Sequence, residues 1–535
     1  MLLPKDRYSD YIGLRDKDIT PKWKKIEPVD EKHYKAITPN NISIELSNEV
    51  NTTFDVNKTP QYQSTMLWYH SLAWLRIIFK DHQNFALVNE FIDAYDAFMN
   101  SHISDKIFST LTSRDHLVAE QIKNLTYLLA QDDERFRNKE KTFNILSKLV
   151  NWAILPNSIA DNNHGMMLAS SLLHIPLFIK MDSLIDNRIV DLASARLTEI
   201  VEGAFDSYGL CNENTPIYQN FYIRFLKHQI NELAFLEKYD ERYVSISYRL
   251  TNILKIAEQT LTLIALPTGE LPPLGDGNAN VGKIMQPLDC AEFYSPESGF
   301  YSVKHKRLRS RYFSFKCGYS SVVHKHSDDT SIYYWYDGQP IIMDAGFLNY
   351  DWTDPKNVLV KSQRGHSGAF YKKFDHLYPA TLYRNSTGNN RAISSIALDK
   401  SDNLNIITGE VTIDDTYTVN RTVKFSHLNN ILITDTFSSN DKSAEKCVRF
   451  LVPKYYDLTH KEEYILISGK NFDMQLRYTK GEAVIKCGMM ENGIPTEGWI
   501  VDKPFESLTE CYVIEIILDK NTNYVNTNLL MLEKQ

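Results

Sequence analysis

The first half of the chain places its apolar residues at the spacing of amphipathic helices. Val118, Ile122, Leu125 and Leu129 step by four, three and four residues, which gives a helix one apolar stripe. The same spacing recurs from residue 61 to residue 264 and predicts about eight helices whose short connections make neighbours antiparallel. This pattern alone does not choose between a bundle, a solenoid and a toroid.

After residue 285 the pattern changes to short alternating runs separated by turn residues, as expected of β-strands. Asp337-Gly338 is a hairpin signal between two of these runs. Runs of this kind, continued to the end of the chain, predict a large antiparallel sandwich. The clearest runs are 300–303, 333–336, 341–344, 417–425, 431–437, 464–468 and 512–518.

A segment rich in proline and glycine, residues 266–282, separates the two patterns. Such residues end regular structure. We therefore predict an N-terminal extension over 1–60, a helical domain over 61–285 and a β-sandwich domain over 286–535. Because helices and strands are segregated along the chain, the expected class is multidomain α+β.

Composition excludes several classes of protein. The 535 residues include 59 Lys and Arg against 67 Asp and Glu, a net charge of −8, which argues against a protein that coats nucleic acid. No apolar run approaches the roughly 18 residues of a membrane span. No apolar signal core follows Met1, so we expect a cytoplasmic protein, or a periplasmic or secreted one if the N-terminus was trimmed. The sequence does not predict the oligomeric state.

His324 and His326 form the first candidate site. Residues i and i+2 of a strand share a face, so a strand here would point both imidazoles the same way. A tight turn at Asp337-Gly338 would return the chain so that Asp344 lies opposite Ser331, close to His326. We therefore expect Asp344 and His326 to converge.

His366 lies 22 residues beyond Asp344 and completes a candidate ligand set with His326. Two imidazoles and one carboxylate suit a tetrahedral divalent ion with one position left open. The alternative is that these are hydrogen-bonded histidines on separate strands.

Two further motifs lie at predicted helix starts. Asn163 and His164 follow Asn162, and asparagine is a good helix N-cap, so capping is the simplest role for one of these residues. Tyr218 and Tyr222 lie i,i+4 on one face of a helix that begins near Pro216. The alternative for both tyrosines is a place in the core.

Taken in order, these motifs resemble the heparinase II/III-like polysaccharide lyases. The resemblance runs from about residue 60 to the end of the chain and rests on a Gly-Asp turn at the domain junction, an HxHxD element, a downstream Asp-x-Gly, an Arg-x-His and the two helix-start motifs. In this sequence they read Asn163-His164-Gly165, Glu213-Asn214-Thr215-Pro216-Ile217-Tyr218, Gly275-Asp276, His324-Lys325-His326-Ser327-Asp328, Asp344-Ala345-Gly346 and Arg364-Gly365-His366.

The resemblance implies an incomplete α/α-toroid followed by the sandwich, and β-elimination of an acidic, uronic-acid-containing polysaccharide or oligosaccharide. Asn163, with His164, would neutralise the uronate carboxylate. Tyr218 and His324 would transfer protons, with Tyr350 as a reserve base. Tyr222 and Arg364 are expected to contact the substrate, and a zinc-like ion on the three candidate ligands would have a mainly structural role.

Two departures from the family pattern leave an alternative open. The histidine that follows the motif tyrosine in the family is Gln219 here, and the usual His-Asn-Thr is His366-Ser367-Gly368. The alternative function is a catalytically silent carbohydrate-binding or capsule-assembly protein on the same scaffold. A glycoside hydrolase is disfavoured, because it needs a pair of carboxylates across the bond and the matched motifs supply imidazole and phenol.

Overall fold

The structure, a computed structural model, describes residues 8–15, 23, 25–52, 61–178, 183–277, 286–306, 309–384, 387–401 and 403–534. The chain divides into two compact units. The helical unit comprises residues 1–204 and 224–252, and the sandwich unit comprises residues 205–223 and 253–535. Two long helices contribute residues to both units, so the predicted boundaries at residues 60 and 285 remain predictions.

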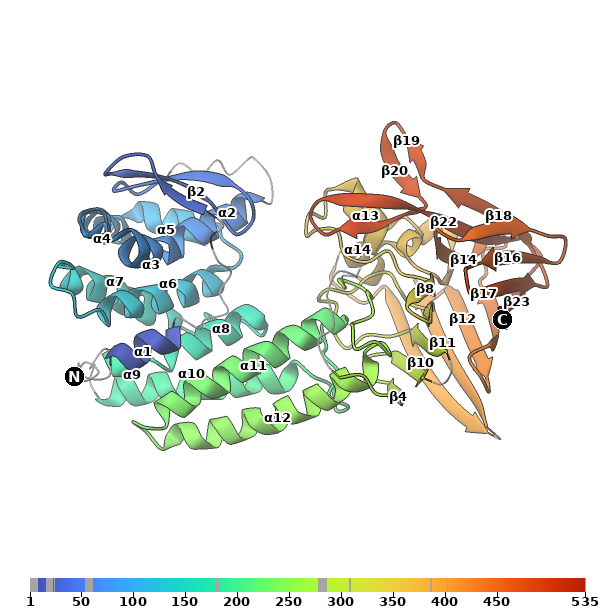
Figure 1. Cartoon of the computed structure of the whole chain (residues 1–535), viewed down its shortest axis with the longest axis horizontal. Coiled ribbons are helices and arrows are strands. Elements are labelled where there is room, and N and C mark those ends of the chain that lie inside the picture. The colour runs from blue at the N-terminus through green and yellow to red at the C-terminus, as the bar shows by residue number, and fades with distance from the viewer. Residues whose placement is uncertain are drawn as a thin grey trace. The chain divides into compact units, whose positions relative to one another are not determined.

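The helices expected between residues 61 and 264 are present, coloured blue to green in Figure 1. Short helices and a π-turn lie between some of them. Their bounds are α1 Tyr8–Arg15, α2 Gln61–His70, α3 Ala73–Ile77, η2 Ile78–His82, α4 Phe85–Met99, α5 His102–Ser109, α6 Arg114–Leu129, α7 Lys139–Ala153, α8 Asn163–Leu172, α9 Ile175–Phe178, α10 Ser183–Gly203, α11 Pro216–Leu236 and α12 Arg242–Ile264.

Helix α6 is buried on almost every side, not along one stripe as the periodicity indicated. It is the central helix of this part of the molecule, so its polar side chains must find partners inside the protein. Gln121 donates to the hydroxyl of Tyr95 at 2.8 Å, and Asn124 donates to the carbonyl of Ser71 at 3.0 Å. Among the described helices, none combines the length and apolar character that a bilayer span requires.

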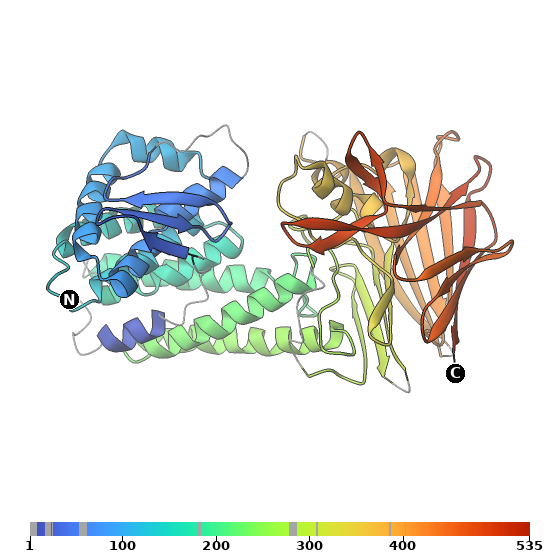
Figure 2. The ribbon, with the colours of Figure 1, turned by 45° about the horizontal axis from the view of Figure 1, so that its top comes forward.

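The N-terminal extension forms α1 and a three-stranded antiparallel sheet, which consists of β1 Lys25–Pro28, β2 His33–Ile37 and β3 Ser43–Ser47. The sheet lies beside helices of the helical unit in Figure 2. The ring of Tyr34 on β2 packs edge-on against His82, with ring centroids 5.2 Å apart. The sequence pattern did not predict these strands, because they are short and mostly exposed.

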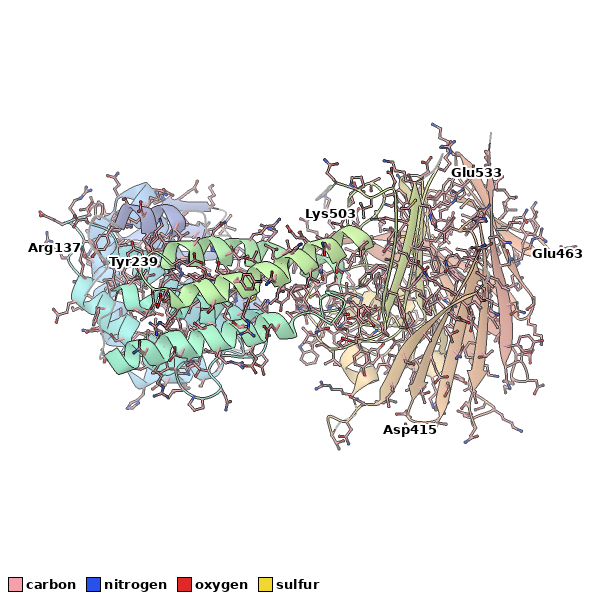
Figure 3. All side chains as sticks on the ribbon, turned by 90° about the horizontal axis from the view of Figure 1, so that it is seen from below. Arg137, Tyr239, Asp415, Glu463, Lys503 and Glu533 are labelled. Atoms are coloured by element: carbon pink, nitrogen blue, oxygen red, sulfur yellow. The ribbon has the colours of Figure 1, made fainter. Side chains whose placement is uncertain are left out.

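The sandwich unit consists mainly of antiparallel strands. One sheet has the order β10-β11-β12-β13-β23-β17-β16-β15, a second contains β18-β22-β14-β9 with β21 paired to β22, and a third has the order β4-β5-β6-β7-β8; β19 and β20 form a hairpin. The turn that contains Asp415, labelled in Figure 3, joins β11 to β12. The first strands are β4 Cys290–Ser295, β5 Phe300–Lys306, β6 Ser310–Lys316, β7 Ser331–Tyr336, β8 Gln339–Ile342 and β9 Ala369–Tyr371.

The later strands are longer. They are β10 Ala392–Ser401, β11 Leu404–Ile413, β12 Tyr417–Phe425, β13 Asn430–Ser438, β14 Lys446–Pro453, β15 Asp457–His460, β16 Tyr464–Ser468, β17 Phe472–Tyr478, β18 Glu482–Cys487, β19 Met489–Glu491, β20 Ile494–Glu497, β21 Trp499–Lys503, β22 Ser507–Leu518 and β23 Tyr524–Glu533. Short helices α13 Pro355–Lys361 and α14 Pro379–Tyr383 and the 3-10 turns η3 Gln363–Gly365 and η4 Lys372–Phe374 connect β8, β9 and β10.

Alternation explains why these runs form strands. In β12 every second residue, from Tyr417 to Phe425, is buried, so one face joins the core while the other meets solvent. By contrast, β7 is buried at all six positions and supplies aromatic side chains to two separate core clusters. The core therefore lies against both faces of the sheet that leads into the candidate site.

Candidate functional site

The segment that carries His324 and His326 is a loop, not the strand predicted from the sequence. Strand β6 ends at Lys316 and β7 begins only at Ser331. His324 adopts a left-handed backbone conformation, with φ of 53°, which a strand cannot contain and which is often found at functional sites. The prediction failed because the loop is stabilised by buried charges and not by a β-ladder.

Lys325 supplies that stabilisation. Its side chain is buried, bonds to Asp328 and lies 3.3 Å from the carboxylate of Asp329. Asp329 also accepts from the backbone N–H of Gly318 at 2.8 Å and from the hydroxyl of Tyr383 at 2.5 Å. A fully paired buried network of this kind fixes one loop conformation.

The three candidate metal ligands come together in the sandwich unit. One ligand atom each of His326, Asp344 and His366 lies within 4.8 Å of the others, and all three residues are buried. The predicted pairing of Asp344 with Ser331 is wrong. The turn pairs Tyr336 with Gln339 as expected, but a bulge follows and β8 ends at Ile342, before Asp344.

The arrangement of these side chains fits a divalent cation. The Nδ1 atom of His326 and the Nε2 atom of His366 are buried and have no hydrogen-bond partner, a costly state unless a ligand takes their lone pairs. Asp344 accepts from His366 Nδ1 at 2.8 Å, the contact that leaves Nε2 for a metal. Two imidazole nitrogens and a carboxylate are the donor set that zinc prefers.

Asp276 joins His324 to His326. Its Oδ2 atom lies 2.6 Å from Nδ1 of His324, and its Oδ1 atom lies 2.7 Å from Nε2 of His326 and 2.6 Å from Nζ of Lys361. Burial alone would raise the pKa of Asp276, but the hydrogen bonds from both histidines and the charge of Lys361 outweigh it and hold this pKa well below its usual range. The sequence showed Gly275-Asp276 as a motif without assigning Asp276 a role, and it gave no signal for Lys361.

Tyr218 lies against His324. The two rings are stacked with centroids 4.0 Å apart and an interplanar angle of 24°. The hydroxyl of Tyr218 forms a 2.9 Å hydrogen bond with that of Tyr350, whose ring is 52% exposed. Partial burial, followed by the nearby Tyr350, raises the pKa of Tyr218 well above its usual value, so this phenol holds its proton at neutral pH. Tyr218 and His324, the two residues expected to transfer protons, therefore lie in contact.

Glu213 lies on the other side of His324, with Oε2 3.5 Å from its Nε2 atom. The Glu213 carboxylate also accepts a 2.6 Å hydrogen bond from the hydroxyl of Tyr222. Burial raises the pKa of Glu213, and the bond from Tyr222 only partly opposes this. Tyr222 is itself buried, and its hydroxyl is occupied by Glu213. Its role in substrate binding remains a prediction.

The two departures from the family pattern have structural explanations. Gln219 is fully buried; its side chain accepts from the backbone N–H of Cys211 at 2.6 Å and donates to the carbonyls of Gly209 and Ala257. Ser367 is also buried, and its hydroxyl bonds to the backbone of Met343 and Leu451. Both side chains therefore bond to backbone, and neither change removes an exposed polar group.

The remaining predicted site residues make other contacts within their own units. Arg364 is half-buried and pairs with Asp375, with NH2 3.1 Å from the carboxylate. Asn163 begins α8 in the helical unit, where Asn162, not Asn163, caps the helix by accepting from the N–H groups of His164 and Gly165. The ring of His164 stacks on that of His116, with centroids 4.9 Å apart.

Comparison with known proteins matches the C-terminal part of the chain to a domain family and the whole chain to solved structures. Residues 291–509 match the family model of the heparinase II/III-like C-terminal domain. A search of curated protein sequences finds no match. Among solved structures, a crystal structure of heparinase III matches with a TM-score of 0.67 and 11% identity, covering 100% of this chain and 86% of that one.

Two further structures show the same fold. Heparan sulfate lyase HepC from Pedobacter heparinus matches with a TM-score of 0.62 and 13% identity, covering 99% of this chain and 88% of that one. Another heparinase III gene product matches with a TM-score of 0.63 and 13% identity, covering 91% and 81%. The fold is therefore a helical domain followed by antiparallel β-sheets, as in heparinase III, and the predicted fold class is confirmed. The match of residues 291–509 to the heparinase II/III-like C-terminal domain agrees with the resemblance that the sequence motifs indicated.

Proposed function

We propose that this protein is a polysaccharide lyase that cleaves a uronic-acid-containing chain by β-elimination. The observation that carries the proposal is the contact among Tyr218, His324 and Tyr350. One imidazole and two phenols meet in one place, with the Tyr218 ring 4.0 Å from that of His324 and its hydroxyl 2.9 Å from that of Tyr350. These are groups that can give and take protons on either side of a glycosidic bond.

The reaction requires three catalytic contributions from the protein. The proton at C5 is only weakly acidic because the adjacent carboxylate is already negative, so donors must stabilise the charge that develops there. A base must remove the C5 proton, and an acid must protonate the leaving oxygen at C4. Asn163, with His164, is assigned stabilisation of the carboxylate charge by its match to the family motif.

Tyr218 and His324 are assigned the two proton transfers. Tyr218 carries its proton at neutral pH and is assigned donation to the leaving oxygen, because its hydroxyl is already hydrogen-bonded to that of Tyr350. The Tyr350 hydroxyl beside it can pass a proton to or from Tyr218 without solvent. His324 has Nδ1 bonded to Asp276, so its Nε2 atom is the one left for the substrate.

His326, Asp344 and His366 would hold a divalent ion, for which zinc fits the donor set. The chemistry that the ion supplies is positioning: it would fix the loop that also carries His324. Activation of water is not required, because elimination uses no water nucleophile.

The silent carbohydrate-binding alternative has little support here. Its main argument was the change to Gln219, and that side chain is buried with its amide bonded to backbone. A hydrolase would need two carboxylates facing one bond. Glu213 is bonded to Tyr222, and Asp276 to both histidines and Lys361.

A panel of uronic-acid polymers tests the proposal. It should include heparan sulfate, which the name of the HepC structure specifies, together with alginate and bacterial capsular chains. A lyase produces a C4–C5 unsaturated uronate, which absorbs in the ultraviolet. New reducing ends without that absorbance would indicate a hydrolase, and binding without cleavage would indicate the silent protein.

The variant Y218F tests the assignment of the phenol. We expect kcat to fall by about 100-fold or more, the usual contribution of a proton-transfer group, with the fold unchanged. Y334F is the matched control, because Tyr334 is buried in the same unit and donates to the carbonyl of Leu428 at 2.9 Å. Full activity in Y218F would remove this residue from the mechanism.

A further inference from the structure

Asp276 is a buried carboxylate whose two oxygens serve two different histidines. Oδ2 bonds to Nδ1 of His324 and Oδ1 bonds to Nε2 of His326, while Lys361 supplies a cation on Oδ1. The side chain of Asp276 is 1% exposed. One carboxylate thus connects the proposed proton-transfer residue with a proposed metal ligand.

These contacts fix which nitrogen of each ring is available. An ionised carboxylate only accepts hydrogen bonds, so Nδ1 of His324 and Nε2 of His326 both carry protons. His324 is then left with Nε2 for the substrate. His326 is left with Nδ1, the buried atom that has no partner among the protein groups. The same residue selects opposite nitrogens on the two rings.

The backbone around Asp276 holds it firmly. It follows Pro272 and Pro273, and the N–H of Gly277 bonds to the carbonyl of Leu274 at 2.9 Å. A Cβ atom at Gly277 would lie 2.6 Å from the backbone nitrogen of Leu274, so this turn tolerates only glycine. The carboxylate is therefore held from the backbone as well as by Lys361.

We propose that Asp276 is a positioning residue that couples the divalent ion site to His324. By accepting from both rings, it makes the orientation of His324 depend on that of His326. The effect of Asp276 on kcat rests on the proposed function, whereas its effect on zinc binding by His326 does not.

The test compares D276N with E232Q in the full-length protein. Asparagine keeps the shape of Asp276 but loses the charge and one acceptor. Glu232 is the matched control, because it is also a buried carboxylate held by one cation and two imidazoles, but in the helical unit. The readouts are kcat and KM on the cleaved polymer, and the rise in the melting temperature of the sandwich unit on addition of zinc ions.

For D276N we expect zinc affinity to fall by about 10- to 100-fold, the usual effect of losing a group that orients a ligand. We also expect kcat to fall by about 100-fold, as for a misplacement near 1 Å, with KM little changed. E232Q should keep both values. Wild-type kcat and zinc response in D276N, or equal losses in E232Q, would overturn the proposal.

Two further measurements separate this inference from the proposed function. If the wild-type protein cleaves no polymer, the zinc response still decides, because it does not require catalysis. A crystal structure of D276N decides independently of both: rotation of the His324 ring off Tyr218 supports coupling, and an unchanged stack refutes it. If D276N does not fold, D276E keeps the buried charge but displaces it, and we expect about a 10-fold loss in both readouts.

Discussion

Glu232 in the helical unit and Asp276 in the sandwich unit are chemically alike. Each is a buried carboxylate that contacts one cation and two imidazoles. The Glu232 cluster consists of Arg15, His174, His228 and Glu232, and the Asp276 cluster consists of His324, His326, Lys361 and Asp276.

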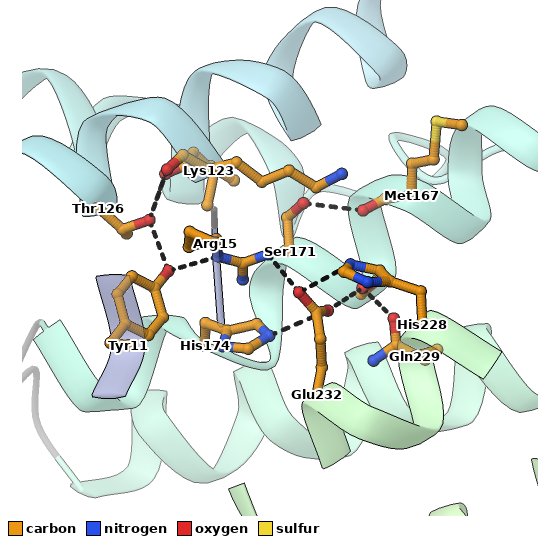
Figure 4. Close-up of polar contacts among 12 residues, drawn as sticks. Tyr11, Arg15, Lys123, Thr126, Met167, Ser171, His174, His228, Gln229 and Glu232 are labelled. Carbon is orange, nitrogen blue, oxygen red and sulfur yellow. Dashed lines mark hydrogen bonds and ion pairs between the residues drawn. The ribbon is translucent and has the colours of Figure 1, made fainter. Parts of the chain in front are cut away.

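The two clusters differ in what surrounds them. In the Glu232 cluster, drawn in Figure 4, Arg15 on α1 bonds both to Glu232 and, at 3.0 Å, to the hydroxyl of Tyr11. Its side chains are at most 12% exposed. In the Asp276 cluster, His324 is 18% exposed and stacks on Tyr218, which bonds to the half-exposed Tyr350.

This difference shows how one set of groups can serve two purposes. Burial would raise the pKa of Glu232, but Arg15 and His174 keep it well below its usual value, so the ion pair is permanent and connects α1 to the helices. In the Asp276 cluster the same groups contact His324, the residue proposed to transfer a proton, and His326, whose Nδ1 atom has no hydrogen-bond partner. We therefore expect the first cluster to govern stability and the second to govern activity.

The largest effect on stability should come from R15M. It removes the cation and leaves Glu232 buried beside two imidazoles, a change that typically costs about 3 to 5 kcal/mol. Chemical unfolding followed by a probe in the helical unit measures it, and kcat of the folded fraction should not change. In R15M/E232Q the orphaned charge is also gone, so part of the loss should return. If both variants were as stable as the wild-type protein, the cluster would not hold α1.

Removal of a bound metal should destabilise the sandwich unit and leave the helical unit unchanged. If an ion is held by His326, Asp344 and His366 at 100 times its dissociation constant, it stabilises the folded state by about 2.7 kcal/mol. A chelator should therefore lower the melting temperature of the sandwich unit and not that of the helical unit. D344N should melt at the lower temperature with or without chelator. An equal response in both units would contradict the assigned ligands.

Features set by residues close together in the sequence could be predicted, whereas features set by contacts between distant residues could not. The helices and the turn at Asp337-Gly338 follow from local spacing, and the structure agrees. The convergence of His326 with Asp344 was also expected, but through a strand pairing that the structure does not contain. The conformation of the loop at His324 does not follow from local spacing, because it is set by the buried side chain of Lys325. Asp276 lies 48 residues before His324, and although Gly275-Asp276 was visible as a motif, nothing local indicated that its carboxylate contacts two histidines and a lysine.

The Glu232 cluster was missed for the same reason. Arg15 and Glu232 are 217 residues apart, and an arginine in a short N-terminal segment is normally expected to lie on the surface. Hydrophobic periodicity describes which face of an element is buried, but not which charges meet inside. Buried polar contacts between distant segments are therefore the part of a fold that a single sequence conceals most completely.

The smallest predicted effect concerns acid stability. His70 in the helical unit is fully buried, and burial lowers its pKa from 6.5 to about 3. The unfolded chain therefore binds a proton that the folded chain does not between these values, and stability falls as the pH drops below 6.5. At pH 5 the loss is about 2 kcal/mol.

The sandwich unit should resist the same change. In Asp328 and Glu515 burial opposes ionisation, but Lys325 and Arg449 lower the two pKa values to about 2. The stability that they contribute is complete above pH 4.5 and is lost only as the pH falls from there toward 2.

Hydrogen exchange at pH 7 and pH 5, corrected for the intrinsic rates, measures the two units separately. Protection should fall in the helical unit and hold in the sandwich unit. There burial lowers the pKa of His326, whereas for His366 the charge and hydrogen bond of Asp344 outweigh burial and raise the pKa, so that the two effects oppose each other. In H70F, whose ring can still stack on Phe98 as His70 does, the helical unit should lose part of its dependence on pH in this range, because burial also lowers the pKa of His116 to about 3. If protection in the wild-type protein fell first in the sandwich unit, neutral His70 would not be the group that limits acid stability.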